Sequence, residues 1–281
     1  DSYHRCKGSE WDPWECALMR SSRCKIVAVR DHLTARGLIR NGVLAKAPGN
    51  PMMDGFEKLI CPEILKNTRR LILLCGSRMP EAITNFKRLI FSAEQIDSSS
   101  SLSILVALGS EPSLNLIEKT LLGLGYIKLL EDEEELKADS VFEKDSLKVF
   151  IGVGKFSKWA NLAEVGIANS GTATEQLVGL GIPCVSLPGK GPQFKYSFAL
   201  RQSRLLGGSV VPCKSYKQLS ERVGLLLRDT KFRDKLSLQG QKRMGLPGGS
   251  ELLAQLILKA FFQNNWTSYN LQITKLDLGS S

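Results

Sequence analysis

The sequence predicts an α/β fold, a Rossmann-like, mostly parallel sheet with helices on both faces. Short apolar runs alternate with longer segments of helical periodicity along most of the 281 residues. The runs are continuously rich in Val, Ile and Leu, which is typical of parallel strands buried on both faces. About six strand–helix units fit between residues 70 and 262, enough for one such domain.

The predicted elements follow one another in a regular series. The first unit stands apart, with a strand at 24–29 and a helix at 30–42 that ends at Gly42. Further strands are expected at 70–77, 102–108, 147–153, 164–170, 182–188 and 208–213. Further helices are expected at 80–96, 112–125, 156–164, 172–181, 194–207, 215–229, 231–244 and 250–262.

The charge and the cysteine and histidine content limit the kinds of partner and site that we expect. The net charge is +10, but the basic residues are spread along the chain and an acidic run at 131–135 interrupts them. We therefore expect no nucleic-acid partner, while an anionic membrane surface or a phosphorylated substrate stays open. Seven cysteines without a C-x-x-C pair and only two histidines predict no metal site and favour a reducing compartment. No apolar run reaches the roughly 18 residues of a membrane span.

The stretch Asn-Ser-Gly-Thr-Ala-Thr-Glu-Gln, residues 169–176, follows a predicted strand and opens a predicted helix. Such a turn offers free N–H groups and the positive end of the helix dipole, which together bind phosphate. Gly171 would let the backbone approach a ligand, and Ser170 and Thr172 add hydroxyl groups. Glu175, one turn into the helix, could bind ribose hydroxyls. The alternative is that Thr172 and Glu175 form a capping box and serve the helix alone.

Two more turns are expected on the same rim of the sheet. The loop Pro-Gly-Lys-Gly-Pro-Gln-Phe at 188–194 contributes two glycines, a lysine and the amide of Gln193. Gly76 and Ser77 end the strand at 70–77 and form a second candidate phosphate turn. A plain turn is the alternative for both. Neither a Walker loop nor a G-x-G-x-x-G with a suitably placed acid is present, which argues against a nicotinamide cofactor.

Several of these motifs together resemble a known family. "GSR", "NSGTATEQ" and "GIPCVSLPG", in that order, resemble the carboxy-terminal half of GT-B glycosyltransferases. "VRDHLTARGLIRNGV", "GNPMMDGFE", "GKGPQF" and "RLLGGSV" are similar to the lipid-A-disaccharide synthase-related branch of cyanobacteria and plants. The resemblance extends over about residues 14–262.

The resemblance implies two Rossmann-like domains that face a cleft. Residues 1–67 would be the end of the amino-terminal, acceptor-side domain and the interdomain link, with most of that domain outside this chain. Residues 68–248 would be the nucleotide-sugar donor domain. The helix at 249–262 would pack back towards the first domain, and 263–281 would be an irregular tail.

The resemblance also implies roles for single residues. Gly76 and Ser77 would approach the diphosphate. Ser170, Gly171 and Thr172 would hold the diphosphate at a helix N-terminus. Glu175 would bind the ribose, and Gln193 would face the sugar or a phosphate.

No catalytic base is assigned. Asp12, Glu15, Asp31 and Asp54 are acids of the amino-terminal segment, and nothing in the sequence marks one of them as a base. Asn50, Pro51 and Asp54 would lie near the domain junction, where a turn and helix capping are the favoured role.

The leading functional hypothesis is a glycosyltransferase that moves a sugar from a nucleotide diphosphate, UDP-linked by resemblance, to a lipid-like acceptor. It needs no cofactor beyond the nucleotide-sugar substrate, and the resemblance points to the cytoplasm or a plastid, at a membrane periphery. A sugar-nucleotide epimerase or hydrolase is the second hypothesis. A non-catalytic nucleotide-sugar-binding fragment and a plain scaffold are the others.

Overall fold

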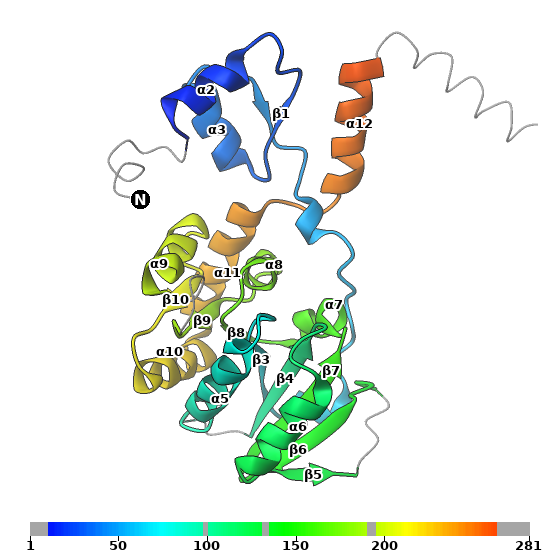
Figure 1. Ribbon diagram of the computed structural model, residues 1–281, viewed down its shortest axis with the longest axis vertical. Helices are drawn as coiled ribbons and strands as arrows, with labels where there is room; N and C mark the ends of the chain where they lie inside the picture. Colours follow the sequence, from blue (N-terminus) through cyan, green and yellow to red (C-terminus); the bar gives the residue numbers. More distant parts are fainter. Residues whose placement is uncertain (1–10, 98–100, 131–134, 190–194, 263–281) are drawn as a thin grey trace, which may run out of the picture. The chain divides into compact units, whose positions relative to one another are not determined.

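The computed structural model describes residues 11–97, 101–130, 135–189 and 195–262 (Figure 1). They divide into two compact units. The larger is Gly55–Met244, and the smaller combines the described parts of Asp1–Asp54 and Gly245–Ser281. The division falls at residues 54/55 and 244/245, whereas the sequence-based boundaries are 67/68 and 248/249.

The larger unit is built on an eight-stranded sheet with the order β10-β9-β8-β3-β4-β7-β6-β5 (Figure 1). Its strands are β3 (Arg69–Leu74), β4 (Leu102–Leu108), β5 (Ile127–Leu129), β6 (Ser140–Lys144), β7 (Leu147–Val153), β8 (Val165–Ala168), β9 (Cys184–Ser186) and β10 (Val210–Pro212). β3, β4, β7, β8, β9 and β10 pair in parallel. The predicted α/β fold with a mostly parallel sheet is confirmed.

The sequence prediction missed two strands, β5 and β6. β5 and β6 pair with each other in an antiparallel register, and β6 pairs antiparallel with β7. β5 has only three residues, and two of them, Ile127 and Lys128, are exposed. Such a short, half-exposed strand at the sheet edge lacks the continuous apolar run by which the parallel strands were predicted.

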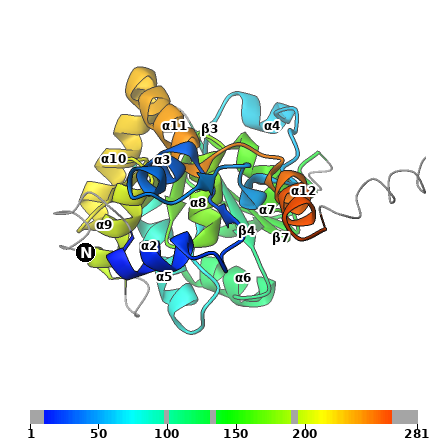
Figure 2. The same ribbon diagram turned by 90° about the horizontal axis from the view of Figure 1, so that it is seen from above.

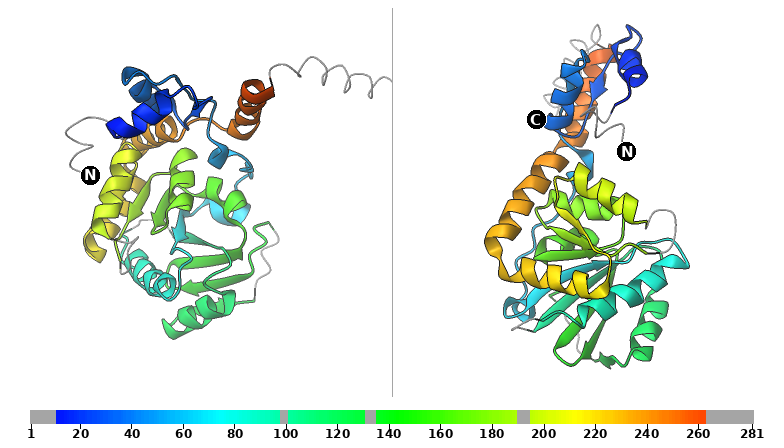
Figure 3. Two further views of the ribbon diagram at one scale, coloured as in Figure 1. Left: turned by 45° about the horizontal axis from the view of Figure 1, so that its top comes forward. Right: turned by 90° about the vertical axis from the view of Figure 1, so that its left-hand side faces the viewer.

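Helices cover both faces of this sheet (Figure 3). They are α4 (Glu63–Lys66), α5 (Glu81–Ala93), α6 (Leu114–Gly123), α7 (Phe156–Trp159), α8 (Thr172–Gly179), α9 (Tyr196–Leu205), α10 (Tyr216–Arg228) and α11 (Thr230–Met244). α10 and α11 lie side by side (Figure 2). The predicted helix at 156–164 is shorter than expected, because α7 ends at Trp159 and continues as a 3₁₀ turn, Ala160–Leu162.

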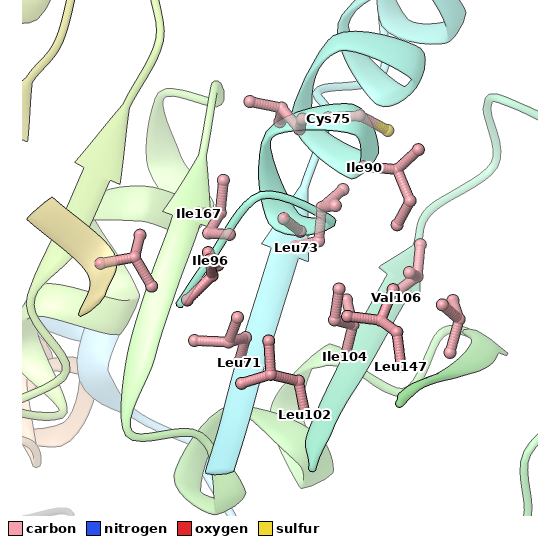
Figure 4. Close-up of a cluster of buried hydrophobic side chains, with 14 of the residues drawn as sticks. Leu71, Leu73, Cys75, Ile90, Ile96, Leu102, Ile104, Val106, Leu147 and Ile167 are labelled. Atoms are coloured by element: carbon pink, nitrogen blue, oxygen red, sulfur yellow. The ribbon is translucent and has the colours of Figure 1, made fainter. Parts of the chain in front are cut away.

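On one face of the sheet, alternate strand residues meet the apolar stripes of α5, α6 and α10. Leu71 and Leu73 of β3 and Ile104 and Val106 of β4 are fully buried there, with Ile90 of α5 above them (Figure 4). Because side chains alternate across a strand, these residues share one face. Burial of such side chains is the main favourable term for this unit.

On the other face, glycines let helices approach the strands closely. A Cβ at Gly152 of β7 would lie 2.4 Å from the ring of Trp159, so only glycine leaves room for this fully buried indole. The indole Nε1–H of Trp159 donates to the carbonyl of Leu136 at 3.1 Å. Gly166 of β8 likewise leaves room for Leu177 of α8. These contacts fix α7 and α8 against the sheet.

A charged cluster closes the amino end of the sheet. Glu164, directly before β8, accepts hydrogen bonds from the guanidinium of Arg69 at 2.9 and 3.1 Å and from the backbone N–H of Arg70 at 3.0 Å. Arg233 of α11 donates to the same carboxylate at 3.4 Å. Burial alone would raise the pKa of Glu164, but the hydrogen bonds from Arg69 and Arg70 outweigh it and lower the pKa.

The smaller unit has a two-stranded parallel sheet of β1 (Val27–Ala28) and β2 (Ala45–Lys46). Its helices are α2 (Pro13–Arg20), α3 (His32–Arg40), the 3₁₀ turn η1 (Pro51–Met53) and α12 (Gly249–Phe262). The fully buried Leu38 and Val43 are central to a small core. Apart from Gly249, the described residues of α12 are at least partly exposed.

The segment Asn50–Asp54 makes the turn and the helix cap expected of it. Asn50 Oδ1 accepts from the N–H of Met52 at 3.1 Å, which starts η1. The carboxylate of Asp54 accepts from the N–H groups of Gly248 and, at 2.9 Å, Ser250, and so caps α12. A hydrogen bond from the Ser250 side chain, together with these bonds from backbone N–H groups, lowers the pKa of Asp54.

Cys75 and Cys184 are buried free thiols. Burial raises the pKa of Cys75 to about 12 and also raises the pKa of Cys184. Among the helices of the described residues, none combines the length and apolar character needed to cross a membrane.

Candidate functional site

The site lies where the sheet changes its direction of winding. β3 connects onward to its neighbour β4, whereas β8, on the other side of β3, connects onward to β9. β3 and β8 run in parallel, with Leu74 opposite Ala168, so their carboxyl ends lie side by side. The turns that leave these two strands therefore diverge and open a crevice, the usual ligand position in open α/β sheets.

An open cavity of about 730 Å³ occupies this crevice. It is lined by residues 74–78, 107–109, 111, 154, 156–157, 169–173 and 198. These residues lie at or after the carboxyl ends of β3, β4, β7 and β8 or belong to α9, and all of them are part of the larger unit. The volume is within the range of sites that hold ligands of nucleotide size.

Five of the predicted site residues border this one cavity. They are Gly76, Ser77, Ser170, Gly171 and Thr172. Glu175 is half-buried on α8 and is not among the lining residues. Gln193 lies outside the described residues.

The α8 N-terminus does not form the capping box that was the alternative to phosphate binding. That interpretation needs Thr172 at the N-cap, but Thr172 is the first helical residue and the N-cap is Gly171, which has no side chain. A Cβ built on Gly171 would meet nothing within 4 Å. The first turn of α8 thus begins at the cavity with no side-chain cap from its N-cap residue, the arrangement that favours an anion.

The turn after β3 depends on glycine for a different reason. Gly76 has a φ of +87°, a conformation that L side chains rarely adopt. Ser77 and Arg78, which follow it, line the cavity. Among the described lining residues, Arg78 is the one cation and Glu111 the one acid.

Asn169, which the sequence analysis did not assign to the site, ties the turn to the sheet. It is buried directly after β8, and its amide donates to the carbonyl of Leu187 at 2.6 Å. Its Oδ1 accepts from the N–H of Leu187 at 3.1 Å and from Ser186 Oγ at 3.2 Å. These bonds join the ends of β8 and β9 and so fix the backbone position directly before Ser170. An asparagine directly after an apolar run was the signal available in the sequence.

The start of the loop at 188–194 is held by α5. Arg88 donates to the carbonyl of Pro188 at 3.0 Å. A Cβ at Gly189 would lie 2.4 Å from Asn85 Oδ1 and 2.7 Å from the Arg88 guanidinium, so glycine allows the close approach. The remainder of the loop, 190–194, lies outside the described residues.

Three of the acids considered as a catalytic base are engaged in helix capping. Glu15 accepts from the N–H of Asp12 at 2.7 Å, and Asp31 accepts from Thr34 at the start of α3. Asp54 caps α12. Within the described ranges, no cluster of three or more His, Cys, Asp or Glu could hold a metal ion. The catalytic base stays unassigned.

Comparison with known proteins identifies the fold. No protein-family model and no curated protein sequence matches the chain. A Listeria monocytogenes protein assigned as a UDP-N-acetylglucosamine 2-epimerase is similar in structure, with a TM-score of 0.56 and 14% identity over 85% of this chain and 60% of its own. The S. aureus MnaA–UDP complex has a TM-score of 0.54 and 14% identity over 83% of this chain and 59% of its own.

WaaG, a glycosyltransferase involved in lipopolysaccharide biosynthesis, matches at a TM-score of 0.46 and 13% identity over 85% of this chain and 65% of its own. The chain spans about 60% of the length of the first two structures. The chain therefore has a Rossmann-like α/β fold similar to that of these two structures, and neither of them is described as a lipid-A-disaccharide synthase.

Proposed function

We propose that the larger unit binds the diphosphate of a UDP-linked sugar, as the donor-binding part of a glycosyltransferase. One observation carries this proposal: two glycine turns, at Gly76 and Gly171, border a single cavity at the point where the winding of the sheet reverses. Free N–H groups at a helix start, with Arg78 beside them, match the charge and geometry of a diphosphate. In a transfer reaction the same groups would stabilise the departing diphosphate.

The acceptor is the less constrained part of the proposal. A lipid-like acceptor and a place at a membrane surface rest on the sequence resemblance and on the net charge of +10. An epimerase is the second candidate, because one structural neighbour with a TM-score above 0.5 is assigned as a UDP-N-acetylglucosamine 2-epimerase and another is a UDP complex.

Calorimetric titration with UDP and with UDP-N-acetylglucosamine tests the binding step. We expect saturable binding that weakens about tenfold or more in Gly171→Ala, since a methyl group there would occupy the space of the phosphate. Gly123→Ala is the matched control, because its added Cβ also meets nothing within 4 Å but lies at the end of α6. Absence of binding by the folded wild-type chain would overturn the proposal.

Turnover separates the enzyme classes. We would incubate the chain with UDP-N-acetylglucosamine and follow the sugar by NMR, with and without a lipid acceptor. Sugar transfer that depends on the acceptor supports the glycosyltransferase. Isomerisation without an acceptor supports the epimerase, and binding without turnover supports a non-catalytic module.

The assignment of Glu175 to the ribose stays a prediction. Because Glu175 does not line the cavity, a ribose role would require its carboxylate to reach a ligand from one turn inside α8. That role requires Glu175→Ala to weaken UDP binding about tenfold while leaving inorganic pyrophosphate binding unchanged. Equal losses for both ligands would exclude it.

A further inference from the structure

The buried side-chain amide of Gln202 contacts the backbone of the turn at Ser170 and Gly171 that begins α8. Gln202 of α9 is only 6% exposed. Its Nε2 donates to the carbonyl of Gly171 at 3.3 Å and lies 3.5 Å from the carbonyl of Ser170. Thr174, fully buried, donates from Oγ1 to the same Ser170 carbonyl at 2.7 Å. Two buried polar side chains thus converge on two consecutive carbonyls of the turn.

Hydrogen bonds that fix the two carbonyls also fix the direction of the N–H groups of Gly171 and Thr172. In a planar trans peptide, the C=O and the following N–H point in opposite directions. The carbonyl of Ser170 belongs to the same peptide as the N–H of Gly171, and the carbonyl of Gly171 to that of Thr172. Since both carbonyls face Gln202, these two N–H groups face away from it. Gly171 and Thr172 line the large cavity.

Both carbonyls also have a hydrogen-bond donor other than Gln202. The Gly171 carbonyl also accepts from the N–H of Glu175 at 3.2 Å, and the Ser170 carbonyl keeps its bond from Thr174. A small void of about 10 Å³, roughly one water, lies beside Ser170 and Gln202. Beside this void, the hydrogen bonds from Gln202 and Thr174 contribute to the direction in which the two carbonyls point.

We propose that Gln202, together with Thr174, is a positioning residue that aims the N–H groups of Gly171 and Thr172 at the diphosphate of a bound nucleotide sugar. The inference rests on the proposed function, because the anion it serves is the diphosphate assigned there. Gln202 acts through the backbone of the turn and not by contact with the ligand.

The test compares Gln202→Met with the wild-type chain. Methionine keeps nearly the same shape and removes the donor. Affinities for UDP and for inorganic pyrophosphate are measured by calorimetry, and the backbone amide signals of Gly171 and Thr172 are followed by NMR. Ser220→Ala is the control, since it removes a buried hydroxyl-to-carbonyl bond from α10, which does not line the cavity.

We expect Gln202→Met to lower both affinities about tenfold, as for the loss of well-aimed charge-assisted bonds. The ligand-induced shifts of the Gly171 and Thr172 signals should shrink, with little change in Tm. Ser220→Ala should leave both affinities unchanged. If Gln202→Met does not fold, Thr174→Val removes the other donor at nearly constant shape and should give the same selective loss.

Unchanged affinities in a folded Gln202→Met or Thr174→Val variant would overturn this inference and leave the proposed function intact. A loss that Ser220→Ala reproduces would show a general structural effect and would also overturn it. If the wild-type chain binds neither UDP nor pyrophosphate, the inference and the proposed function both fail.

Discussion

At the amino end of the central sheet, Glu164 is surrounded by Arg69, Arg70 and Arg233, and the charged groups there satisfy one another. At the carboxyl end of the same strands, Gly76 and Gly171 border an open cavity, and the N-cap of α8 has no side chain to offer. The neighbouring strands β3 and β8 thus carry a closed network at one end and an open turn at the other. Stability and binding are separated along the length of two strands, and substitutions at the two ends should separate them experimentally.

The largest expected effect on stability comes from the amino end. Glu164→Ala leaves three arginine side chains near one another without their shared carboxylate, and should lower the free energy of unfolding by about 3 kcal/mol. UDP affinity should stay the same. Urea denaturation and calorimetry measure the two quantities.

Glu221→Ala is the control for this change, because Glu221 forms an exposed ion pair with Lys217 and its replacement should cost less than about 0.5 kcal/mol. A loss of UDP affinity in folded Glu164→Ala would contradict the separation of the two ends.

Replacement of Asn169 should lower both the stability and the UDP affinity. Asn169→Leu keeps the side-chain size but leaves the N–H and C=O of the buried Leu187 without their partner, at a cost of about 2 kcal/mol. Since Ser170 follows directly, UDP affinity should fall as well. The same two measurements test this, with Asn161→Leu as the control, which loses one exposed bond to the Glu57 carbonyl. A stable variant with full affinity would show that Asn169 does not fix the turn.

The smallest expected effect is a dependence of the free energy of unfolding on pH in the acid range. The pKa of Glu164 in the folded state lies below its ordinary value of 4.5, so its contribution to stability is present above that value. It is lost as the pH falls below 4.5 through the folded-state pKa, because the unfolded chain then binds more protons. Glu164→Gln should therefore show a shallower loss of stability over this acid range than the wild type. Equal slopes in urea denaturation at several pH values would contradict it.

The sequence was most informative where one local pattern decided the structure. The buried runs of β4 and β7 have the bounds predicted, because an uninterrupted apolar segment has few alternatives to a central strand. β5 and β6 were missed, since β6 forms by pairing with β7 and β5 by pairing with β6, and neither has a decisive pattern in its own composition.

The site was predictable in part for the same reason. Gly76, Ser77 and residues 170–172 follow strand ends, so the topology rule brought them together. The contribution of Gln202 could not be predicted, because it reaches the turn from another helix 31 residues away in sequence. The capping box failed on a single position, since the pattern Thr-x-x-Glu does not reveal whether a preceding glycine takes the N-cap.

The packing of Trp159 against Gly152 has an optical consequence. Trp159 is the sole tryptophan in the sequence of Gly55–Met244, and its indole is 1% exposed, whereas Trp14 of the smaller unit is 62% exposed. An indole enclosed in this way emits at shorter wavelength than one in water. The emission of Trp159 therefore reports on the unit that holds the cavity, and its red shift in denaturant follows the unfolding of that unit without any added label.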